Sequence, residues 1–88
     1  MKANIYKSNP NKTAQSIVDS ICNNKKNITV GISKDGYDWL YMNANSLAHL
    51  VEELLADRLG GEYYVVITRE KEYGEYIMHV EYNEVTNE

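Results

Sequence analysis

The chain has 88 residues, of which 43% are hydrophobic and 25% are charged, and its formal net charge is −4. A chain of this length fits one domain and leaves no room for a second, and no apolar run approaches the roughly 20 residues that cross a bilayer. A single cysteine, Cys22, excludes an internal disulfide and a zinc site built from several cysteines. We therefore expect one cytoplasmic α+β domain, residues 1–88, that does not bind a membrane.

Charge is distributed unevenly along the chain. Residues 1–34 contain six lysines and one acidic residue, whereas residues 35–88 contain twelve acidic residues and three basic ones. A split of this kind bears on partners and solubility rather than on fold. Folding can also interleave the two regions, in which case their fields average out.

The first third of the chain predicts a short edge strand followed by an amphipathic helix. Residues 2–7 form the strand, and Pro10 ends it. Asn11 or Thr13 can cap the helix, which closes near Lys25. The apolar residues of the helix recur at the i, i+3, i+4, i+7 spacing of one face: Ala14, Ile17, Val18, Ile21 and Cys22.

A β-hairpin is predicted over residues 28–42. Asp35-Gly36 is a favoured two-residue type I′ turn between the runs ITVGIS and YDWLYM. The hairpin has two faces, and the one that points away from the core carries Leu40 and Met42. The core face carries its apolar side chains: Ile28, Val30, Ile32, Trp39 and Tyr41.

A second helix is predicted over residues 46–59. Asn43 or Asn45 can cap it, and Gly60-Gly61 ends it. Its apolar stripe consists of leucine and valine residues: Leu47, Leu50, Val51, Leu54 and Leu55.

A second hairpin is predicted to join residues 62–69 to residues 75–82 through a four-residue loop, Lys71–Gly74. The loop brings three apolar pairs onto the core face: Tyr63 with Tyr82, Val65 with Val80, and Ile67 with Met78. The polar tail, residues 83–88, is expected to fray.

The element order is thus (β)αββαββ, which predicts an antiparallel sheet of two hairpins with both helices packed on one face. Five apolar residues then point outward, more than scattered surface exposure explains: Leu40, Met42, Tyr64, Val66 and Ile77. A homodimer or another partner is therefore expected to cover an open hairpin face.

No group of residues predicts catalysis. The chain has no phosphate-binding glycine loop and no nucleophile elbow. Cys22 is interpreted as a small buried hydrophobe, and two isolated histidines do not form a metal site. His79, two residues from Glu81, leaves a pH switch or a general base as an alternative. We expect no enzymatic activity, no cofactor and no metal.

Acidic residues alternate with tyrosines in the second hairpin. Carboxylates can stand in for phosphates and steer association, and phenol rings supply contact area at low entropic cost. The alternative is a solvated face whose charges prevent edge-to-edge aggregation. The candidate docking residues surround the hairpin loop and the last strand: Glu70, Glu72, Tyr73, Glu75, Tyr76 and Glu81.

In size, α+β order and its acidic, tyrosine-rich segment EYYVVITREKEYGEYIMHVEYNE, residues 62–84, the chain resembles small phage and prophage inhibitors. Anti-CRISPR and other anti-defence proteins are examples. The resemblance is one of type and carries no motif or functional residue with it. It implies a non-catalytic inhibitor, encoded by a phage or mobile element, that blocks a host nucleic-acid-handling protein such as a nuclease or its complex.

Two other functions stay open. Trp39, Tyr41 and Tyr64 could line a pocket for a small ligand or nucleotide, shared by two copies of the chain. The lysines of residues 1–34 could contact nucleic acid, although an isoelectric point near 5.1 and the presence of only two arginines argue against it.

Overall fold

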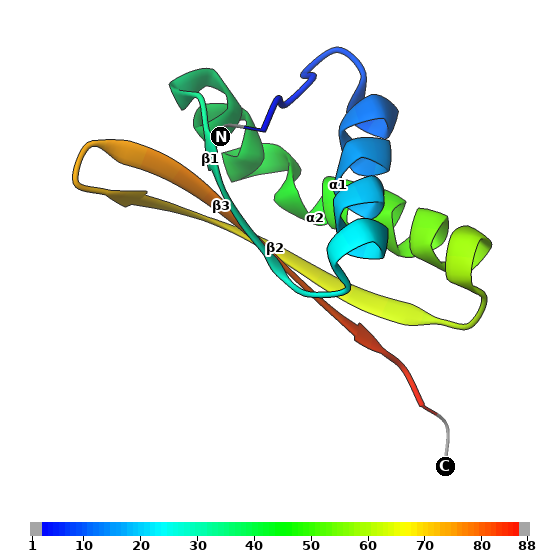
Figure 1. Ribbon diagram of the computed structural model, residues 1–88. Helices are drawn as coiled ribbons and strands as arrows, with labels where there is room; N and C mark the ends of the chain where they lie inside the picture. The colour runs from blue at the N-terminus through cyan, green and yellow to red at the C-terminus, as the bar shows by residue number, and fades with distance from the viewer. Residues whose placement is uncertain (1–2, 87–88) are drawn as a thin grey trace.

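The computed structural model describes residues 3–86, in which two helices cover one face of a three-stranded antiparallel sheet (Figure 1). The α+β class is therefore confirmed. The predicted order (β)αββαββ is wrong, because the sheet has three strands in the order β1-β3-β2. Along the chain the elements are α1 (Pro10–Asn24), β1 (Ile28–Ile32), α2 (Lys34–Leu59), β2 (Tyr63–Glu72) and β3 (Glu75–Glu84).

Helix α1 begins earlier than predicted. Asn9 is its N-cap, and the Asn9 side chain accepts a hydrogen bond from the Lys12 N–H at 3.2 Å. Pro10 occupies the first turn, where its missing N–H costs nothing, so it opens the helix instead of ending a strand. The helix ends at Asn24, and Lys25 takes the left-handed conformation that commonly follows a helix.

The N-terminal segment is not the predicted strand, although it lies beside β1. The Ala3 N–H donates to the Gly31 carbonyl at 2.9 Å. Thr13, predicted as a cap, is buried instead, and its hydroxyl oxygen accepts from the Tyr6 N–H at 2.8 Å. These two hydrogen bonds fasten the segment between β1 and α1. Residue 2 of the predicted strand lies outside the described residues.

The hairpin predicted over residues 28–42 is wrong, because residues 34–59 form one helix, α2. Ser33 is the N-cap, and its side chain accepts from the Gly36 N–H at 3.0 Å. Asp35 therefore lies in the first helical turn, where a negative charge is favourable. The buried residues of α2 follow the helical period from its first turn to its last: Gly36, Leu40, Leu47, Ala48, Val51 and Leu55.

Gly36 is required by packing and not by a turn. A Cβ added to it would lie 2.8 Å from Cγ1 of Ile5, where the N-terminal segment crosses the start of α2. The glycine that suggested a hairpin thus permits a close approach between two segments that lie far apart in sequence.

The hairpin of β2 and β3 has a two-residue turn instead of the predicted four-residue loop. Tyr73 and Gly74 both have positive φ, 51° and 78°, as a type I′ turn requires. The shorter turn moves the register by two residues, so that the observed core pairs are Val65 with Tyr82, Ile67 with Val80, and Arg69 with Met78. Because a shift of two leaves every side chain on its own face, the predicted core face is confirmed.

The core lies between the two helices and the inner face of the sheet. Strand β3 continues to Glu84, and the Val85 N–H donates to the Glu62 carbonyl at 2.8 Å, whereas residues 87–88 of the predicted tail lie outside the described residues. None of the helices described over residues 3–86 is both long and apolar enough to cross a membrane. The sheet contributes five buried side chains: Ile32, Val65, Ile67, Met78 and Val80.

Candidate functional site

The candidate site lies on the sheet face that is turned away from the helices (Figure 1). Strand alternation brings eleven side chains to it. Leu40, predicted to lie on an outward face, is buried in α2 instead, and Met42 is exposed on that helix. We call the surface the outer face, and it consists of Thr29, Tyr64, Val66, Thr68, Glu70, Glu72, Glu75, Ile77, His79, Glu81 and Asn83.

The two faces of the β2–β3 hairpin carry opposite charges. Arg69 and Lys71, the basic residues of these strands, lie on the helix side. Within the described part of the chain, no lysine or arginine forms an ion pair with an outer-face glutamate. In the sequence of residues 62–84, glutamates alternate with Arg69 and Lys71, and a strand places alternate residues on opposite faces. The sequence pattern therefore indicates this separation of charge. The carboxylates of the outer face belong to Glu70, Glu72, Glu75 and Glu81.

The basic residues of the hairpin are held by aromatic rings of α2 and β3. The Arg69 guanidinium lies 4.0 Å from the centre of the Tyr37 ring and 4.9 Å from that of Tyr41, and it donates to the Tyr37 carbonyl at 3.0 Å. The Lys71 ammonium lies 5.7 Å from the ring centre of Tyr76, which itself packs against Tyr37 with centroids 4.9 Å apart. These contacts hold positive charge away from the outer face.

His79 lies near the middle of the outer face, between Thr29 and Glu70. Its Nε2 is 2.8 Å from Oε1 of Glu70, and its Nδ1 is 3.1 Å from the hydroxyl oxygen of Thr29. Because a carboxylate only accepts, Nε2 carries the proton, and in the neutral ring Nδ1 accepts from the hydroxyl. Thr29, His79 and Glu70 thus form a hydrogen-bonded row across the three strands on the outer face.

The predicted docking residues are separated by the structure into three places. Glu70, Glu72, Glu75 and Glu81 share the outer face. Tyr73 occupies the turn, where 97% of its surface is exposed. Tyr76 instead lies half-buried on the helix side, against Tyr37.

Glu72 and Glu75 face each other beside the turn of the hairpin. Like charges directly opposite on neighbouring strands destabilise a hairpin, by about 0.2–1 kcal/mol. The tip therefore keeps an unfavourable pair of charges next to its exposed tyrosine.

The residues predicted to bind a small ligand do not line a common pocket within one chain. Trp39 is half-buried and Tyr41 exposed on α2, whereas Tyr64 lies on the outer face, across the sheet. Tyr41 instead contacts Arg69. Any pocket that contains all three would need a second copy of the chain.

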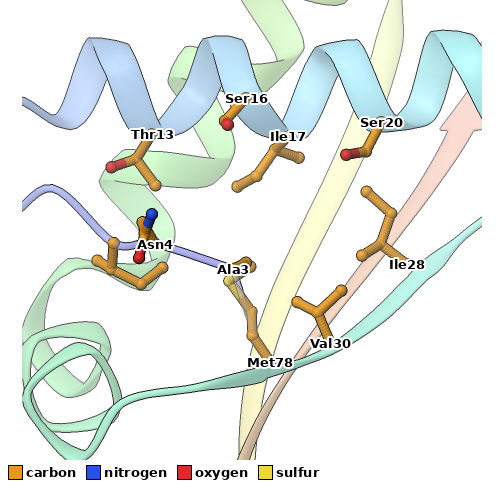
Figure 2. A pocket seen from close by; sticks show the side chains of 10 residues that line it. Ala3, Asn4, Thr13, Ser16, Ile17, Ser20, Ile28, Val30 and Met78 are labelled. Atoms are coloured by element: carbon orange, nitrogen blue, oxygen red, sulfur yellow. The ribbon is translucent and has the colours of Figure 1, made fainter. Parts of the chain in front are cut away.

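Two cavities lie near β1. Figure 2 shows the smaller one, of about 50 Å³, where Ala3, Ile17 and Met78 meet between the N-terminal segment, α1 and the sheet. The larger one, of about 590 Å³, lies between Gly31–Lys34 and Gly74–Tyr76. The first is far smaller than the roughly 300–1,000 Å³ of small-molecule sites.

The lysines of the first third make separate contacts. The Lys7 ammonium is 3.6 Å from Asp35, and that of Lys34 is 2.7 Å from Asp38. The hydrogen bond to Asp38 and its charge raise the pKa of Lys34. The Lys12 ammonium lies 4.4 Å from the centre of the Tyr6 ring. Folding thus brings part of the basic region against acidic residues of α2.

Among residues 3–86, no three histidine, cysteine, aspartate or glutamate side chains gather closely enough to hold a metal ion. Comparisons with protein-family models, curated proteins and solved structures find no match. The candidate site is therefore defined by the geometry and charge of the outer face alone.

Proposed function

We propose that this protein is a non-catalytic inhibitor that binds a basic, nucleic-acid-handling protein through the acidic outer face of its β2–β3 hairpin. The observation that carries the proposal is the separation of charge across the sheet. Four glutamates lie on the open face, while Arg69 and Lys71 lie on the helix side.

The outer face has the composition that docking onto a basic surface requires. Its carboxylates can occupy positions that nucleic-acid phosphates otherwise take, and their shared field steers a basic partner toward the sheet. Tyr64, 60% exposed, lies on the same face as Val66 and Ile77 and adds apolar contact. Tyr73 extends this contact at the turn.

Inhibition follows from occupancy and needs no chemistry. A protein that covers a groove made for a phosphate backbone prevents the nucleic acid from entering it. The host partner and the phage or mobile-element origin stay predictions that come from the sequence resemblance.

The proposal is tested by capture from a bacterial lysate treated with nuclease, with two baits that carry the same change in charge. Glu72→Lys with Glu75→Lys changes the outer face, and Glu53→Lys with Asp57→Lys changes exposed positions of α2. We expect a basic, nucleic-acid-binding protein to be retained by the wild type and the α2 variant and lost by the outer-face variant. Its DNA or RNA binding should fall as wild-type inhibitor is added. Equal capture by both variants, or undiminished nucleic-acid binding, would refute the proposal.

A further inference from the structure

Strand β2 forms one edge of the sheet, and its backbone groups show which residues face outward along that edge. In an edge strand, alternate N–H and C=O groups point away from the neighbouring strand. The Val65 N–H donates to Oε2 of Glu52, on α2, at 2.9 Å. Since β3 is the neighbour of β2 in the sheet, this bond identifies the odd-numbered residues of β2 as those that face the open edge.

Helix α2 covers this edge at Val65 and leaves the part nearer the turn open. The next odd-numbered residues are Ile67, Arg69 and Lys71. Among residues 3–86, no side chain accepts a hydrogen bond from their backbone N–H groups. The strand has no proline, and its ten register pairs run without a bulge, so neither of these two devices blocks hydrogen bonding along this stretch. The charged side chains of residues 69–72 are the protection that remains, and they select the charge of any strand that pairs here.

We propose that the edge at Ile67–Glu72 binds an extended, basic segment of the partner as a fourth strand of the sheet; this inference rests on the proposed function. The main chain of the added strand would pair with the three open residues. Its outer-face side chains would lie beside Glu70 and Glu72, where lysine or arginine is complementary.

The same charges disfavour a second copy of this chain at the edge. A two-fold antiparallel pairing centred on residue 69 places Arg69 opposite its own copy. Pairings centred on residues 70 and 71 do the same for Glu70 and Lys71. Like charges directly opposite are destabilising, so the open stretch does not match itself.

The test uses the full chain and a fluorescein-labelled peptide of sequence Thr-Lys-Thr-Lys-Thr-Lys-Thr. With the lysines on the outer face, the threonine N–H groups point toward β2. The matched peptide carries N-methyl groups on its threonines, which keeps its charge and removes these donors. The matched proteins are Lys71→Pro, which removes an edge N–H, and Lys71→Ala, which keeps it.

We expect the plain peptide to bind about tenfold or more tightly than the N-methylated one, as the loss of the three threonine N–H donors opposite the open residues predicts. Lys71→Pro removes one donor and should weaken binding of the plain peptide about two- to tenfold, and Lys71→Ala should not weaken it. The comparison of peptides holds even where Lys71→Pro fails to fold.

Equal affinity for the two peptides would overturn the fourth strand and leave the docking of a basic partner on the outer face standing. No binding of either peptide would also overturn the fourth strand, while lysate capture decides the proposed function separately. A dimer seen by sedimentation and abolished by Lys71→Pro would assign the edge to a second copy and overturn the inference as well.

Discussion

The continuity of α2 can be tested by comparing Leu40→Ala with Met42→Ala. In a strand, residues 40 and 42 would lie on one face and respond alike. In the observed helix they point in different directions, so that 1% of Leu40 and 80% of Met42 is exposed. Leucine, methionine and alanine all favour helices, so helix propensity contributes little to the difference.

The expected magnitude follows from the burial of Leu40. Leu→Ala removes three carbon atoms, which at about 0.8 kcal/mol each corresponds to about 2.4 kcal/mol of transfer free energy. The cavity left behind raises the loss to about 3–4 kcal/mol. Met42→Ala should change the free energy of unfolding by no more than about 0.5 kcal/mol. A domain of this size has a total of roughly 4–13 kcal/mol, so the first loss is a large fraction of it.

Urea denaturation followed by circular dichroism measures both losses, provided that the m-values of the two variants agree. Thermal melting should show a fall of about 12–30 °C for Leu40→Ala. If the two variants lost similar amounts of unfolding free energy, the result would refute the helix over this segment and support a strand instead.

Three further substitutions test other contacts of the fold by the same denaturation measurement. Ser33→Ala should cost about 1 kcal/mol by removing the cap of α2, and Ser33→Asp should restore most of it; no loss would show that the cap is not formed. Thr13→Val should cost about 1–3 kcal/mol because the Tyr6 N–H loses its acceptor, and a neutral result would show that water replaces the hydroxyl. Tyr73→Asn should stabilise the chain by about 0.5–1 kcal/mol, because asparagine tolerates positive φ better than tyrosine; a destabilised variant would contradict the type I′ turn.

The sequence predicts the β2–β3 hairpin better than the rest of the chain, and the reason is periodicity. A register shift by an even number of residues leaves each side chain on the same face of the sheet. The error in turn length shifted the register by two residues, so the prediction still placed Val65 and Ile67 on the core side. The turn itself was missed because it places Tyr73 in a conformation that single-residue propensities disfavour. The same alternation contained the separation of charge on which the candidate site depends.

The start of α2 and the partner of β1 were predicted wrongly, because contacts between distant segments contribute to both. Asp35-Gly36 fits a hairpin turn locally and competes with the equally local Ser33 cap, whereas the passage of Ile5 over Gly36 appears only in the folded chain. Strand β1 pairs with β3, so that Ile28 meets Val80 across most of the chain. His79 contacts Thr29 through this pairing, which no local pattern reveals.

The central position of β3 also has a consequence for biosynthesis. Both other strands hydrogen-bond to β3, so the sheet cannot assemble until the ribosome has made this strand. Until then the nascent helices have no sheet to cover, and their apolar stripes depend on each other or on a chaperone. A stop codon before Glu75 would therefore remove the sheet entirely and not merely shorten it.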